Sequence, residues 1–170
     1  VATLLEELDV PSSDADKMAQ SVLDWMDSDD TARLGSVDGD DYEKAPVPCK
    51  PSNMVPRSWD EFRLMDNFPV LFLDENSHPT QLFLDFMSAV SLYNSDAVNI
   101  NDAPEIVIET LAELGGFDAE EVARKMAGND RIRGTSDDQL LSETSELGDG
   151  SPSSDVSESS WSSEVPRMTS

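Results

Sequence analysis

The sequence predicts a mainly α protein, and three observations support this fold class. Apolar residues recur at helical spacing in several segments of residues 1–134. Ser or Asp precedes three of these segments, with Glu three residues later in each, which is the spacing of a capping box. Runs that alternate polar and apolar residues, as strands do, are almost absent. We therefore expect helices joined by short capped turns, with no repeat of fixed period.

The N-terminal part of the chain is expected to form two helices and then a long loop. Residues 1–8 are amphipathic, and Pro11-Ser12-Ser13 opens the second helix. The apolar face of this second helix has helical spacing and consists of Met18, Val22, Trp25 and Met26. Four prolines in residues 43–57 exclude regular structure there and predict an extended crossing loop.

Two helices are predicted after this loop. Ser58 and Glu61 have capping-box spacing, and the helix that they start is expected to bury Phe62 and Met65. Residues 80–93 give a strong amphipathic pattern, and we expect its apolar stripe to be core. That stripe consists of Leu82, Phe83, Phe86, Met87 and Val90.

Two more helices are predicted before residue 134. Val98 and Ile100 lie on one side of a short extended stretch. Asp102 can cap the next helix, with Pro104 in its first turn and Glu105 completing the box. The apolar residues of this helix are Ile106, Val107, Leu111 and Leu114. Gly115-Gly116 is expected to stop it. Asp118 and Glu121 form the capping pair of the last helix, and its apolar residues are Val122 and Met126.

Composition divides the chain into a helical domain, residues 1–134, and a tail, residues 135–170. The tail is rich in Ser, Asp, Glu and Gly, and it holds eight acidic residues and one basic residue. Such a segment cannot bury enough apolar surface to offset the entropy of ordering. We therefore expect most of the tail to be mobile.

Charge limits the partners of the chain. Asp and Glu number 36 against 11 Lys and Arg, for a formal net charge of −25. Nucleic acids and anionic lipid surfaces repel such a chain, and its natural counterpart is a divalent cation or a basic protein surface. No apolar run approaches the ~20 residues that cross a bilayer, and residues 1–8 lack a signal pattern. We expect the soluble part of a longer protein.

One cysteine and one histidine exclude further classes of site. With Cys49 alone, no intrachain disulfide can form. His78 alone excludes a metal site with several His ligands, and a Ser-His-Asp triad would have to use this loop residue. No nucleophile–base constellation is evident, so the sequence does not predict an enzyme.

The acidic segment, residues 24–43, is the best entry to function. It holds eight carboxylates, and Arg33 is its only basic residue. Like charges at this density repel one another unless solvent or a cation compensates them. Asp27 and Asp29 stand at the one–three spacing that lets two carboxylates reach one ion. Asp38 falls at the twelfth place from Asp27, where an EF-hand has its bidentate acid.

The acidic segment is nevertheless not an EF-hand, because its fifth and sixth places are Thr31 and Ala32. The residues predicted to bind calcium in a loop of similar chemistry are Asp27, Asp29, Asp38 and Asp41. A solvated acidic loop without metal is the alternative. Magnesium fits less well because it retains its waters, and a glycosidase fits less well because no two carboxylates stand out.

Five motifs follow one another in a specific order. The first is Asp24-Trp25-Met26-Asp27-Ser28-Asp29, and the second keeps Gly35, the acid at 38 and Tyr42. The others are the proline-rich stretch from Pro46 to Asn53, the helix start with Ser58, Glu61, Phe62 and Met65, and Val98-Asn99-Ile100-Asn101-Asp102-Ala103. In this order they resemble the K-type minor pseudopilin of bacterial type II secretion systems, the general secretion pathway protein K family. The resemblance covers about residues 15–126.

The resemblance implies a fold and a metal. The fold is a helical domain with SAM-like and helix-hairpin-helix-like parts, inserted into a pseudopilin α+β fold, and the tail is then a remnant of the pilin β region. Calcium is implied in the acidic segment and carries over to Asp27, Asp29 and Asp38. Asp38 is shorter than the family Glu and Gly39 replaces an acid, so Asp41 is expected to compensate.

The resemblance also implies a structural role in protein export across the outer membrane. The K-type subunit is expected to cap the tip of the pseudopilus, in complex with the I- and J-type minor pseudopilins. The full-length protein is expected to be anchored by an N-terminal membrane helix, at the periplasmic face of the inner membrane.

A nucleic-acid-binding module is the alternative function. Val98 to Asn101 and the helix after them also resemble the start of a helix-hairpin-helix unit, which grips phosphate through backbone amides. The chain lacks the Gly-x-Gly hairpin of that unit, and Glu105, Glu109 and Glu113 make the surroundings acidic. We therefore expect no nucleic-acid partner.

Overall fold

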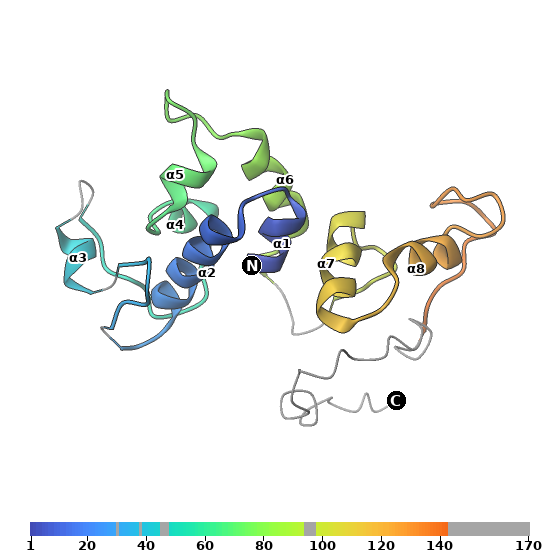
Figure 1. The fold of residues 1–170 in the computed structure, drawn as a ribbon, viewed down its shortest axis with the longest axis horizontal. Coiled ribbons are helices and arrows are strands. Elements are labelled where there is room, and N and C mark those ends of the chain that lie inside the picture. Colours follow the sequence, from blue (N-terminus) through green and yellow to red (C-terminus); the bar gives the residue numbers. More distant parts are fainter. Residues whose placement is uncertain (30, 38, 45–47, 94–97, 143–170) are drawn as a thin grey trace. The chain divides into compact units, whose positions relative to one another are not determined.

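A computed structural model describes residues 1–29, 31–37, 39–44, 48–93 and 98–142, without the side chain of Asp40. Within these residues the fold is mainly α, with eight helices and one isolated antiparallel bridge between Leu73 and Pro79 (Figure 1). The predicted fold class is confirmed. The chain divides into two compact units, Val1–Leu111 and Ala112–Ser170. The division predicted at residue 134 from composition stays a prediction.

The first two helices form where the sequence predicts them. Helix α2 (Ser12–Met26) packs against α1 (Ala2–Glu7) and α5 (Phe68–Phe72) (Figure 1). Its buried apolar residues recur every three or four positions and are Ala15, Met18, Val22 and Trp25. Met26, at the end of the helix, is half-buried against the same core.

An aromatic cluster fills the core of the first unit. It comes from α4 (Trp59–Phe62), α5 and α6 (Gln81–Ala89). Its members are Trp59, Phe62, Phe68, Phe72, Phe83 and Phe86. Neighbouring ring centroids lie 5.0 to 6.3 Å apart, in edge-to-face or tilted pairs. Such pairs add to the stabilisation that burial of the rings gives.

The capping box before α4 is confirmed in its first half. The hydroxyl of Ser58 accepts a hydrogen bond from the N–H of Glu61 at 3.1 Å. The carboxylate of Glu61 accepts from the N–H of Arg57 at 3.0 Å, one residue before the predicted donor. Phe62 and Met65 are both buried as predicted, although α4 ends at Phe62.

The helix predicted over residues 80–93 is shorter than expected. The structure ends α6 at Ala89, because Val90 already has extended backbone angles. The predicted stripe is core: Phe83 and Phe86 are buried, and the other three members are half-buried against them. Two helices were not predicted at all, α3 (Asp40–Glu43) and α5, each of about one turn.

The segment around α7 (Glu105–Gly115) corrects two predictions. Ile100 does not lie in an extended stretch, since the chain turns at residues 100–102 and the N–H of Ala103 donates to the carbonyl of Ile100. The buried face of α7 carries Ile108 and Ala112, whereas the predicted Leu114 is exposed. The stop after Gly115 is as predicted.

The second unit contains α8 (Ala119–Met126), capped as predicted by Asp118, which accepts from the N–H of Glu121 at 3.0 Å. The loop after α8 is closed by Asp137, whose Oδ2 accepts from the N–H of Asn129 at 2.8 Å. Hydrogen bonds from Thr135 and from two backbone amides hold the pKa of Asp137 below its usual range. The carboxylate of Asp137 therefore holds this loop through hydrogen bonds to its backbone.

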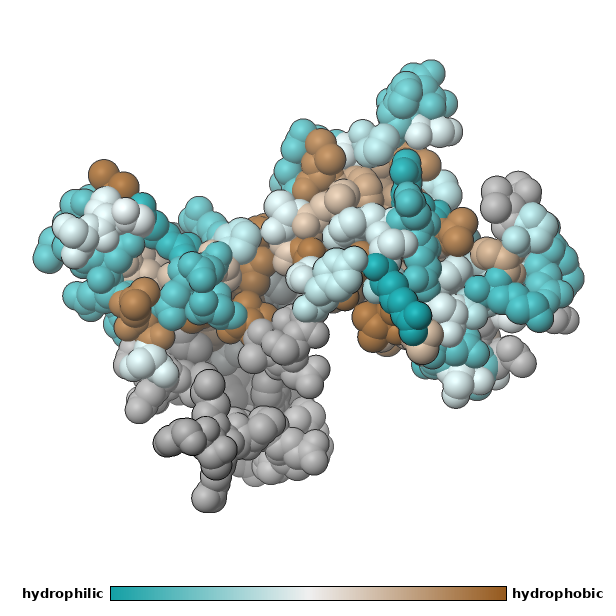
Figure 2. All heavy atoms as spheres, turned by 180° about the vertical axis from the view of Figure 1, so that it is seen from behind, coloured by the Kyte–Doolittle hydropathy of each residue, from teal (hydrophilic) through white to brown (hydrophobic). Residues whose placement is uncertain are grey.

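Hydrophilic residues dominate the surface in Figure 2, where hydrophobic ones are scattered between them. Among the described residues, no helix has both the length and the hydrophobicity that a membrane crossing needs.

Candidate functional site: the acidic segment

Asp24 is the buried anchor of the acidic segment. Its side chain is 0% exposed and lies near the end of α2. Arg33 contacts it twice, because the guanidinium Nη1 donates to Oδ1 and the backbone N–H donates to Oδ2 at 2.9 Å. A buried carboxylate is costly unless it is paired and hydrogen-bonded. The return of the chain at Arg33 therefore allows Asp24 to be buried.

Asp27 shares the same guanidinium. Nη1 of Arg33 also donates to Oδ2 of Asp27. The hydrogen bonds to Asp27 and Asp24 raise the pKa of Arg33 above its ordinary value. The other oxygen of Asp27, Oδ1, is buried and has no hydrogen-bond partner in the described part of the chain. Asp27 thus has one oxygen paired with Arg33 and one oxygen without a hydrogen-bond partner, which we call its open oxygen.

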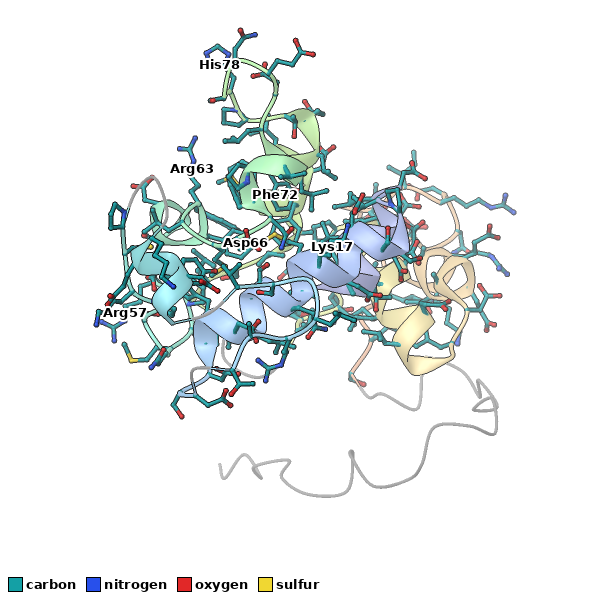
Figure 3. The ribbon with its side chains drawn as sticks, turned by 60° about the vertical axis from the view of Figure 1, so that its left-hand side comes forward. Lys17, Arg57, Arg63, Asp66, Phe72 and His78 are labelled. Atoms are coloured by element: carbon teal, nitrogen blue, oxygen red, sulfur yellow. The ribbon has the colours of Figure 1, made fainter. Side chains whose placement is uncertain are left out.

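The loop that carries Arg33 folds back along α2, which Figure 3 shows with Lys17 labelled. The Nδ2 atom of Asn67 lies 2.9 Å from Oγ of Ser21 on α2 and 3.0 Å from the carbonyl oxygen of Gly35 in the loop. Gly35 has a φ of +90°, and a Cβ there would lie 3.0 Å from Cγ of Lys17. The glycine thus allows both the turn and the close approach to α2.

Aromatic residues fix the two ends of the segment. Trp25 and Tyr42 are both buried, with ring centroids 5.3 Å apart. The indole N–H of Trp25 donates to Oε1 of Glu61 at 3.0 Å, and the hydroxyl of Tyr42 accepts from the N–H of Asp66 at 3.0 Å. Burial raises the pKa of Tyr42 to about 12. The two ends of the acidic segment are therefore joined by a buried contact between Trp25 and Tyr42, which we call the base of the loop.

The four predicted calcium ligands are in different situations. Asp27 faces Arg33, and Oδ1 of Asp29 accepts from the N–H of Thr31 at 2.8 Å. Asp41 is exposed and lies 3.4 Å from Nζ of Lys44. Asp38 lies outside the described residues. Among the described residues, no group of three or more His, Cys, Asp or Glu side chains is placed so that it could hold a metal ion. Calcium binding stays a prediction.

The chemistry of Asp27 nevertheless suits a hard cation. Carboxylate oxygens are the donors that calcium prefers, and the open Oδ1 of Asp27 is such a donor. Arg33 supplies the positive charge beside it in this structure. A calcium ion that binds Asp27 would therefore compete with the guanidinium of Arg33, which already neutralises this carboxylate.

Two residues that shape the site, Asp24 and Asn67, were not among the site residues predicted from the sequence. Asp24 had a signal, since it stands a helical step after Ser21 beside the apolar face of α2, where buried polar residues need partners. Asn67 had none that points to its contacts. Its φ of 64° is tolerated by Asn better than by most residues, but its partners lie 32 and 46 positions away.

Comparison with protein families identifies the part of the chain that contains this loop. Residues 1–75 match the family model described as Type II secretion system (T2SS), protein K. Comparison with curated proteins and with solved structures gave no significant match. The matched residues include α1 to α5 and the whole acidic segment. Protein K is a structural component of the secretion system and assembles with other pseudopilus components. The match, which covers less than half of the chain, supports a K-type pseudopilin of the type II secretion system.

Proposed function

We propose that this chain is the helical domain of a minor pseudopilin that caps the tip of the type II secretion pseudopilus. The protein K match over residues 1–75 supports the proposal. A bulky helical domain at the tip would block the addition of further subunits above it. Its partners in the tip complex would be the I- and J-type minor pseudopilins. An N-terminal membrane helix outside this chain would anchor the full-length protein at the periplasmic face of the inner membrane.

Calcium binding in the acidic segment is the second part of the proposal. The ligands would be Asp27, Asp29, Asp38 and Asp41, and the open oxygen of Asp27 is the observation that supports it. Calcium would neutralise carboxylates that repel one another and so rigidify the loop. Its binding to the folded state alone would raise the free energy of unfolding.

Thermal unfolding with and without calcium tests the metal. Millimolar calcium is expected to raise the melting temperature, and Asp27→Ala with Asp29→Ala is expected to abolish the rise. Asp16→Ala with Asp60→Ala is the matched control, because it removes two exposed carboxylates outside the segment. A wild-type chain whose melting temperature ignores calcium would contradict the calcium part of the proposal.

Assembly is tested separately. The purified chain is mixed with the periplasmic domains of the I- and J-type subunits and analysed by size-exclusion chromatography, in calcium and in chelator. We expect one peak that contains all three proteins. Elution of the chain apart from the other two in both buffers would contradict a tip complex formed through this domain.

The nucleic-acid alternative gains no support from the structure. Glu105, Glu109 and Glu113 recur every four residues along α7, so they share one side of the helix. Carboxylates in such a row repel a phosphate backbone.

A further inference from the structure

We infer that Arg33 is a built-in counter-cation, which closes the acidic segment without metal and competes with calcium for Asp27. The inference rests on the proposed function only in taking calcium as the competing cation. Its basis is the shared contact of one guanidinium nitrogen with Asp24 and Asp27.

The two carboxylates need a positive charge close to them. Asp24 and Asp27 are three positions apart, one at the end of α2 and one just past it, so their carboxylates repel each other. Arg33 is the only basic residue within residues 24–43. Lys17, farther up α2, already lies 2.7 Å from Asp14. Arg33 is therefore the residue that neutralises the pair.

The two contacts of Arg33 are unequal. Asp24 is fully buried, and it also accepts the backbone N–H of Arg33. The Asp27 side chain is 23% exposed, receives only the side chain of Arg33, and keeps Oδ1 open. The side chain of Arg33 is itself 38% exposed, so it can move without repacking the core. Asp27 is thus the carboxylate that can exchange a guanidinium for a metal ion.

The backbone of Arg33 is held independently of its side chain. The N–H of Ser36 donates to the carbonyl of Arg33 at 3.1 Å, closing a turn with Gly35 in its third position. A side-chain substitution at Arg33 therefore keeps the backbone bond to Asp24. Such a variant removes the counter-cation and keeps the two backbone hydrogen bonds of Arg33.

Three variants test the inference by thermal unfolding and by calorimetric titration with calcium chloride. Arg33→Met removes the charge, Arg33→Lys keeps a charge without the planar guanidinium, and Arg63→Met removes an exposed arginine elsewhere in the same unit (Figure 3). In chelator, Arg33→Met is expected to melt below the wild type and Arg63→Met close to it. Calcium is expected to recover most of that loss, with a Kd about tenfold lower than that of the wild type.

Each outcome bears on one claim. Equal melting of Arg33→Met and wild type in chelator overturns the inference, and so does a loss that calcium does not recover. If Arg33→Met folds only with calcium, the inference is supported. If it never folds, Arg33→Lys decides: tighter calcium binding than the wild type supports the inference, and equal binding overturns it. A wild type that ignores calcium while an Arg33 variant binds it supports the inference and contradicts the calcium part of the proposed function.

Discussion

Trp25 and Tyr42 meet edge to face, with ring centroids 5.3 Å apart and an interplanar angle of 82°. Trp25 lies near the end of α2 and Tyr42 lies in α3, so this contact joins the two ends of the acidic segment. The two ends of the loop therefore meet in a hydrophobic contact, while Arg33, in its middle, is held by its ion pair with Asp24. The unfolding free energy of variants at the base and of variants in the middle of the loop should therefore depend on different physical contributions.

Alkaline pH should destabilise the base of the loop through Tyr42. Burial raises the pKa of Tyr42 from 10.0 to about 12, so the unfolded state loses this proton first. The contribution of Tyr42 to the unfolding free energy is fully present below pH 10 and is lost as pH rises through its pKa in the folded state. Two pKa units correspond to roughly 3 kcal/mol of unfolding free energy. Urea unfolding across this range measures it.

Tyr42→Phe is expected to remove that alkaline step, at the cost of the hydrogen bond from Asp66. Tyr93→Phe is the control, because Tyr93 is largely exposed and is the other tyrosine of the chain. If the wild type and Tyr42→Phe lose stability in parallel as pH rises, Tyr42 is not the group responsible.

Asn67 should combine a hydrogen-bond effect with a backbone effect. Asn67→Ala loses the contacts to Ser21 and Gly35 and places Ala at a φ of 64°. Each hydrogen bond contributes about 0.5–1.5 kcal/mol, and the left-handed backbone costs Ala about 1–2 kcal/mol. We expect Asn67→Gly to lose only the first part. Denaturant unfolding separates the two, and equal losses for Ala and Gly would exclude a backbone effect.

Glu61 should make the stability of the domain depend on pH in the acid range. Burial opposes its ionisation, but hydrogen bonds from the N–H of Arg57 and the indole of Trp25 outweigh it and lower the pKa of Glu61. A lowered folded pKa contributes stability above the unfolded value, and this stability is lost as pH falls through the folded one. Glu61→Gln should therefore flatten the acid limb of the stability profile. Glu75→Gln, at an exposed turn, should leave the acid limb unchanged.

Gly35 should be sensitive because of both its backbone and its neighbour. Gly35→Ala is expected to cost about 1–2 kcal/mol for the positive φ alone, and the added Cβ also meets Cγ of Lys17 at 3.0 Å. In a Lys17→Ala background the second contribution disappears, so the cost should fall. An equal cost in both backgrounds, measured by equilibrium unfolding, would show that Lys17 is not involved.

Local signals account for the parts of the fold that the sequence predicted. Ser58 and Asp118 cap their helices through residues three positions away, so a short window contains the whole interaction. Helix α2 repeats its apolar pattern over 15 residues, which makes its buried face readable. Helices α3 and α5 have four and five residues, too few to show any period. For α7, apolar residues surround most of the helix, so the pattern did not single out Ile108 and Ala112.

The site was less predictable, because it depends on pairs from different segments. The spacing of carboxylates drew attention to Asp27 and Asp29, and it gave no weight to the single base among them. The contacts of Arg33 span six and nine positions across a loop with no regular repeat. Asp24 was passed over because a calcium loop begins at Asp27, although Asp24 is the carboxylate that the fold buries.

The contacts of Asn67 are expected to form late in folding. They join residues separated by 46 and 32 positions in the chain, and closing such long intervals carries an entropy cost that local helices avoid. The hydrogen bond from Asn67 to the Gly35 carbonyl can form only after the segment ahead of α5 has docked on α2. Substitutions of Asn67 are therefore expected to speed unfolding and hardly alter the refolding rate, because its long-range contacts form late.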